Sequence, residues 1–81
     1  MPDLAVEAQS EGQSDRFMAD KAHLYLRGGS HMVWILYSTR QIIEVLTPTD
    51  RHLLTVNDTL TGGAVLPGFS VPVRELWPVE G

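Results

Sequence analysis

Residues 32–37 read MVWILY, and this run restricts the fold more than any other stretch because it is apolar at both odd and even positions. A strand with alternating polarity can leave one face in water, whereas a strand that is apolar on both faces needs a covering layer on each side. Aromatic and β-branched residues favour a strand here. The rest of the chain must therefore supply two layers around a central strand.

The segments around this run predict one α/β (α+β) domain spanning residues 1–81. Its sheet is mixed, with about four strands and one main helix in the order β-α-β-β-β, followed by an irregular tail. Ser14 is a good helix N-cap and Gly28-Gly29 a stop signal. The expected elements are strands at 4–9, 32–37, 41–47 and 52–57, a helix at 14–28, and a loop with a short C-terminal turn at 58–81.

This arrangement leaves one sheet face without a cover. One helix covers one face of a four-stranded sheet, while the central strand needs both faces covered. The pattern therefore predicts that either a partner chain or an N-terminal segment absent from this sequence closes the second face. A homo-oligomer formed through that face is the partner we expect, with Trp77 as a candidate interface anchor.

Composition excludes several classes of protein. The chain has 81 residues and no cysteine, which removes disulfides and thiolate metal sites. A cytoplasmic location fits the absence of cysteine. No apolar run has the length of a membrane span. The net charge of −4 argues mildly against a partner bound mainly through nucleic-acid phosphates.

Glu7 and Gln9 are the candidate site on the first strand, because residues two apart on a strand share a face. A carboxylate and an amide oxygen can converge on a hard cation such as Mg²⁺. The alternative is a solvated face, which the spacing alone favours. Asp3 is excluded as a partner ligand, because four residues of strand place it roughly 13 Å from Glu7.

Lys21 is the second candidate, because it lies within the apolar stripe of the expected helix. Phe17 and Tyr25 are four residues on either side of it. An ammonium group in such a stripe needs a counter-charge or a route to water. Two interpretations stay open: Lys21 extends to solvent at the edge of the stripe, or it reaches Glu7 and Gln9 beside a reacting phosphate.

Residues 6–36 and the tail LTGGAVLPGFSVPVRELW (60–77) resemble the Uma-two family of proposed restriction endonucleases, which is bacterial and assigned to the PD-(D/E)XK nuclease superfamily. The resemblance implies a restriction-endonuclease-like core and metal-dependent phosphodiester hydrolysis of DNA. Glu7 matches the acidic, Mg²⁺-binding position of the superfamily's D/E-x-K step. Gln9 stands where the lysine usually is and would orient water, and Lys21 matches a helical lysine of the family that would stabilise charge on the phosphate.

The resemblance also implies that only the C-terminal half of such a domain is present, because the strand with the first metal-binding aspartate precedes the matched region in the family. One carboxylate makes a weak Mg²⁺ site. We therefore expect little or no nuclease activity from this chain alone. The alternative is a non-catalytic, homodimeric interaction module.

Overall fold

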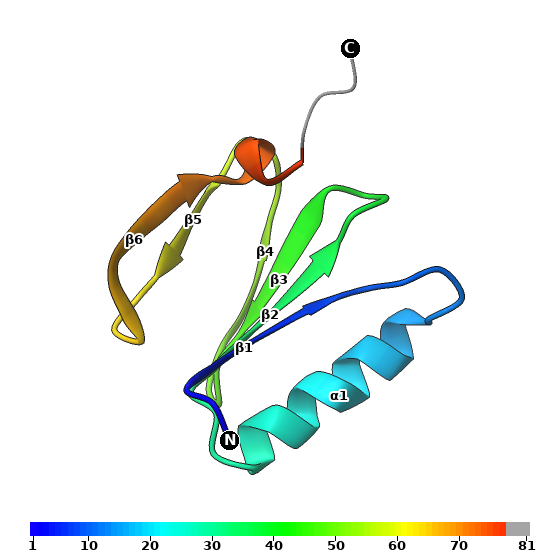
Figure 1. Ribbon diagram of the computed structural model, residues 1–81, viewed down its shortest axis with the longest axis vertical. Helices are drawn as coiled ribbons and strands as arrows, with labels where there is room; N and C mark the ends of the chain where they lie inside the picture. Colours follow the sequence, from blue (N-terminus) through cyan, green and yellow to red (C-terminus); the bar gives the residue numbers. More distant parts are fainter. Residues whose placement is uncertain (78–81) are drawn as a thin grey trace.

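The computed structural model describes residues 1–77, which form six strands, one α-helix and one 3₁₀ helix (Figure 1). The elements are β1 (Leu4–Ala8), α1 (Asp15–Arg27), β2 (Met32–Tyr37), β3 (Ile42–Leu46), β4 (Arg51–Leu54), β5 (Thr59–Gly62), β6 (Leu66–Pro72) and η1 (Val73–Leu76). Within these residues, no helix has both the length and the apolar character that a membrane crossing needs.

The main sheet has the order β1-β2-β3-β4, and the expected mixed α+β class is confirmed. β1 and β2 are parallel, and α1 makes the crossover between them. β2 and β3 are antiparallel, as are β3 and β4. The first four strands and α1 begin and end within three residues of the predicted bounds, and the largest difference is the end of β4 at Leu54.

Local signals in the sequence set the ends of α1. The Ser14 hydroxyl accepts a hydrogen bond from the backbone N–H of Phe17 at 3.0 Å, which satisfies one of the free donors of the first turn. At the other end, the N–H of Gly28 donates to the Leu24 carbonyl at 3.0 Å. Gly29 follows with φ 112°, a backbone conformation that favours glycine and turns the chain toward β2.

β2 has both of its faces covered, as its sequence requires. Val33, Ile35 and Tyr37 pack against α1 in one hydrophobic cluster. Met32 and Trp34 belong to a second cluster on the opposite face. Alternate residues of one strand thus serve two separate cores, because successive strand side chains point to opposite faces of the sheet.

The prediction of an irregular loop over residues 58–81 is wrong for the part that the structure describes, and residues 78–81 lie outside it. β5 and β6 form an antiparallel hairpin, and η1 follows it. Gly63 and Gly68 adopt positive φ, and the pairing is irregular between Thr61 and Gly62. These glycines and the neighbouring prolines interrupt the alternation that normally marks a strand.

The hairpin covers the sheet face opposite α1, so the expectation that a partner or an absent segment closes that face is also wrong over β2 to β4 (Figure 1). Leu60 of β5 and Val73 of η1 are fully buried against this face. The Phe69 ring lies 5.5 Å from the Trp34 ring, centroid to centroid. Trp77 packs at the margin of the same cluster. This finding removes the reason for expecting a homo-oligomer through the main sheet face.

Truncation of Leu60 tests the role of the hairpin. We expect Leu60→Ala to lower the free energy of unfolding by about 2–5 kcal/mol, because it leaves a cavity between the hairpin and the sheet. Leu53→Ala is the matched control, since Leu53 is 52% exposed on β4. Urea unfolding followed by tryptophan fluorescence gives both values. Equal effects of the two substitutions would contradict the assigned packing.

Candidate functional site

The crossover from β1 through α1 to β2 brings Glu7 and Lys21 together. Glu7 points from β1 toward the helix layer, on the same face as the buried Ala5. Lys21 lies in the middle of α1, next to the buried Ala22. The Lys21 ammonium forms an ion pair with Oε1 of Glu7. Of the two interpretations of Lys21, the contact with Glu7 is the one that the structure shows.

This ion pair joins β1 to α1 and is half-buried. The Glu7 side chain is 22% exposed and the Lys21 side chain 41%. Oε1 of Glu7 is inaccessible to solvent and has no hydrogen-bond partner among the described residues beyond its contact with Lys21. Hydrogen bonding and Coulomb attraction to Glu7 raise the pKa of Lys21 above its ordinary value, so the ammonium stays charged.

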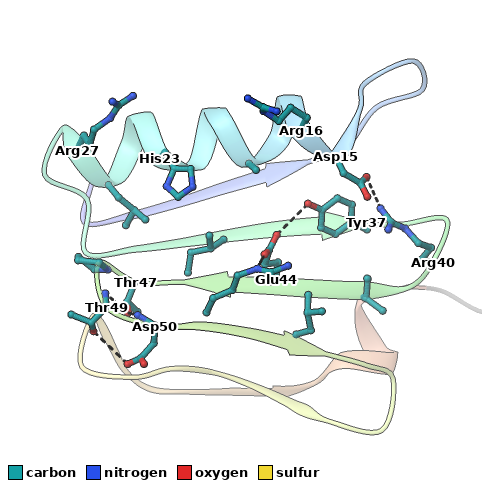
Figure 2. A pocket seen from close by; sticks show the side chains of 17 residues that line it. Asp15, Arg16, His23, Arg27, Tyr37, Arg40, Glu44, Thr47, Thr49 and Asp50 are labelled. Atoms are coloured by element: carbon teal, nitrogen blue, oxygen red, sulfur yellow. Dashed lines mark hydrogen bonds and ion pairs between the residues drawn. The ribbon is translucent and has the colours of Figure 1, made fainter.

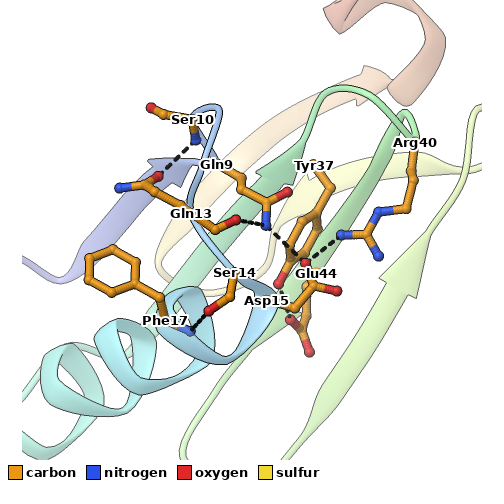
Figure 3. A network of polar contacts seen from close by, with 9 residues as sticks. All are labelled: Gln9, Ser10, Gln13, Ser14, Asp15, Phe17, Tyr37, Arg40 and Glu44. Carbon is orange, nitrogen blue, oxygen red and sulfur yellow. Dashed lines mark hydrogen bonds and ion pairs between the residues drawn. The ribbon is translucent and has the colours of Figure 1, made fainter.

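Gln9 lies away from this pair. Its side-chain N–H group donates to the Gln13 carbonyl and to the Asp15 carboxylate, both at 2.9 Å, and so holds the loop before α1 (Figure 3). The structure therefore brings together two of the three predicted site residues. The role of Gln9 in orienting water stays a prediction, and in this conformation its amide nitrogen is committed to the start of α1.

The carboxylates of the described residues do not complete a metal site around Glu7. Within residues 1–77, no group of three or more His, Asp or Glu side chains is arranged to hold a metal ion. The Asp3 carboxyl is exposed and lies 3.9 Å from the His31 ring nitrogen Nε2. Mg²⁺ is usually held by several oxygen ligands. Glu7 thus offers one ligand, and the donor set of a single chain does not fit a resident Mg²⁺ ion.

A second polar cluster, which the sequence did not reveal, lies in a groove of about 760 Å³ between α1 and strands β3 and β4 (Figure 2). Glu44 of β3 is only 5% exposed at its floor. The Tyr37 hydroxyl donates to Oε1 of Glu44 at 3.2 Å, and Arg51 donates to Oε2. The buried carboxylate is therefore hydrogen-bonded and paired, as burial of a charge requires.

One end of this groove is closed by the ion pair between Arg40 and Asp15, at 2.7 Å (Figure 3). Hydrogen bonds from Arg40 and then Gln9 lower the pKa of Asp15. The Arg40 guanidinium also lies 4.5 Å from the centre of the Tyr37 ring. Burial, and secondarily the Asp15 charge, raises the pKa of Tyr37. The sequence signal for this cluster was Glu44 itself, a carboxylate within an otherwise apolar strand.

Lys21 is the sole lysine of the chain, so its titration is directly observable. We expect the pKa of Lys21 to lie above its ordinary value of 10.5 and to fall back in Glu7→Gln, which keeps the shape but removes the charge. Because folding raises this pKa, its contribution to stability is complete below pH 10.5 and is lost as the pH rises through the folded-state value.

Carbon-13 NMR of the Lys21 Cε resonance measures the pKa in both proteins. Glu11→Gln is the matched control, because Glu11 is exposed in the loop before α1. An unchanged Lys21 pKa in Glu7→Gln would show that the ion pair does not persist in solution.

Comparison with known proteins shows the fold. No family model and no curated protein matches the sequence. Among solved structures, the chain is similar to the crystal structure of a putative nuclease belonging to DUF820 from Anabaena variabilis, with a TM-score of 0.84 and 18% sequence identity. The match covers 94% of this chain and 44% of the neighbour. The fold that the resemblance implied is thereby confirmed to this extent: the chain has the fold of the matched part of that protein.

Proposed function

We propose that this chain contributes the acidic strand and the helical lysine of a metal-dependent phosphodiesterase site that acts on DNA. The ion pair between Glu7 and Lys21 is the observation that carries the proposal. It sets a carboxylate and a cation side by side on a nuclease-like fold. A carboxylate can bind the metal while an ammonium group stabilises charge on the phosphate.

The number of metal-binding side chains in one copy limits how well that copy can bind a metal ion and hydrolyse a phosphodiester. Glu7 is a single carboxylate, and residues 1–77 form no group of three or more His, Asp or Glu side chains that could hold a metal ion. One copy therefore binds Mg²⁺ weakly and cleaves DNA slowly or not at all. A complete site needs at least one further carboxylate from another polypeptide segment. Phosphate attraction adds little affinity for DNA, since the net charge of the chain is −4.

The alternative function is a non-catalytic homodimeric module. Its original support was an open sheet face, and that face is covered by β5, β6 and η1. The half-buried charge pair also has no evident purpose in a purely structural module. The nuclease-type interpretation accounts for this pair and for the fold, so we prefer it.

Titration with Mn²⁺, a paramagnetic substitute for Mg²⁺, tests the role of Glu7. We expect Mn²⁺ to broaden the amide resonances of residues 6–8 and 21 in the NMR spectrum more than those near other carboxylates. Glu7→Gln removes this selective broadening, because the ligand is lost. Lys21→Met strengthens it, because the ammonium no longer competes with the metal for the carboxylate.

Asp20→Asn is the matched control for Glu7→Gln. Asp20 is a carboxylate on the same helix as Lys21, and its only ion pair among the described residues is with Arg16 on the surface. The proposal is rejected if broadening at residues 6–8 is absent, or if it survives in Glu7→Gln.

A further inference from the structure

The outer edge of β1 has free backbone hydrogen-bonding groups. Among residues 1–77, β1 is an edge strand of the main sheet and pairs only with β2. The Met32 N–H donates to the Asp3 carbonyl, and the Gln9 N–H donates to the Leu36 carbonyl. In a parallel ladder, alternate residues of a strand bond to the neighbour. The odd-numbered residues of β1 therefore face β2, and the N–H and C=O groups of Leu4, Val6 and Ala8 face outward.

Exposed apolar side chains gather around this edge. Val6 is 51% exposed on one face of β1, because the hairpin does not extend over it. Phe17 and Leu24 are exposed on α1, one turn before and after Lys21. Lys21 itself contacts Glu7 of β1, so this side of α1 adjoins the β1 edge.

Edge strands of soluble proteins usually carry protection against pairing with other strands, in the form of charges, proline or bulges. The opposite edge of the sheet follows this rule, because β4 exposes Arg51 and His52. β1 has no proline and no bulge between Leu4 and Ala8, and its one charged residue, Glu7, is paired with Lys21 on the helix face. The residues whose backbone N–H and C=O groups face outward are Leu4, Val6 and Ala8, and all three are apolar. The β1 edge is therefore suited to pairing with another strand.

We infer that the β1 edge binds the β1 edge of a second copy of this chain in antiparallel register, with Val6 opposite Val6. Leu4 then lies opposite Ala8, and all three outward-facing residues of each strand form hydrogen-bonded pairs. On the helix face, Glu7 lies opposite Ala5. No like charges oppose each other directly, so the strand is complementary to itself. The two-fold axis is perpendicular to the sheet, so both α1 helices lie on one face and run antiparallel to each other.

This pairing supplies the second carboxylate that a single copy lacks. In the Val6-centred register, the two Glu7 residues are diagonal neighbours on the same face, with their β-carbons about 7–8 Å apart or somewhat less. Their carboxylates can approach one divalent cation between the copies, and each keeps a Lys21 beside it. This composite site rests on the proposed metal-binding role of Glu7. The interface itself does not, since it depends on the strand edge and the apolar residues around it.

Sedimentation equilibrium of the wild-type chain and of Val6→Lys tests the interface. We expect a dimer for the wild type and a folded monomer for Val6→Lys, because lysine on an edge strand opposes pairing. Leu53→Lys is the matched control, since Leu53 is equally exposed on β4 and should leave the dimer intact. A wild-type monomer at NMR concentrations overturns the inference, as does a dimer that Leu53→Lys disrupts and Val6→Lys does not.

Cross-linking gives a second test that does not depend on weakening the fold. The chain has no cysteine, so Val6→Cys introduces a single thiol. Hydrogen-bonded antiparallel pairs have α-carbons about 5.5 Å apart, within the range that a disulfide spans. We expect oxidised Val6→Cys to form a covalent dimer and Leu53→Cys to remain monomeric under the same conditions. The opposite pattern rejects the proposed register.

Metal binding separates the two proposals. If both hold, Val6→Lys weakens Mn²⁺ binding by about tenfold or more while Glu7 remains, because affinity follows the number of carboxylate ligands. If Val6→Lys disrupts the dimer but Glu7→Gln leaves the Mn²⁺ affinity unchanged, the interface is supported and the proposed function is rejected. Glu7-dependent Mn²⁺ broadening that is equal in the wild type and in Val6→Lys supports the function and rejects the composite site.

Discussion

The requirement of β2 for two covering layers organises the whole molecule. Its odd-numbered side chains pack on α1 and its even-numbered ones on the C-terminal hairpin. An 81-residue chain has little surface to spare for a second core, because small domains bury a smaller share of their surface. The hairpin and η1 meet this requirement, because Leu60 and Val73 are buried against the face of the sheet opposite the helix. Val6 of β1 is 51% exposed because the second of these layers does not extend over it.

The sequence predicted the elements whose signals are local and periodic. Ser14, the Gly28-Gly29 pair and the apolar stripe sufficed for α1, and the apolar run at 32–37 sufficed for β2. The hairpin was missed because β6 contains glycine and proline, so its contribution is visible only once Leu60 and Phe69 are seen against Trp34. Tertiary packing overrides local propensity in such segments. The expectation of a missing cover followed directly from that error.

For the candidate site, too, local sequence patterns predicted the positions of single residues, whereas contacts between distant segments were harder to predict. Alternation placed Glu7 on a defined face of β1, and helical spacing identified Lys21 as a cation in an apolar stripe. Their contact depends on the crossover that brings α1 over β1, and this was one of two open interpretations. The cluster around Glu44 was missed because its partners, Tyr37 and Arg51, come from two other strands. Sheet register, which a single sequence does not fix, brings these three residues together.

The charge pair between Glu7 and Lys21 is difficult to explain by stability alone. The helix is already held to the sheet by Met18 and Ala22 against Val33 and Ile35, all of which are buried. Lys21 is 41% exposed, and an ion pair open to solvent adds little to stability. A fold that needed only cohesion at this position would be served at least as well by two apolar side chains. The pair instead lies beside the free edge of β1, where Val6 is exposed. Glu7 and Lys21 form a charged pair at the margin of the helix layer, next to the free edge of β1. This arrangement is expected where a second strand pairs with β1 and completes the site.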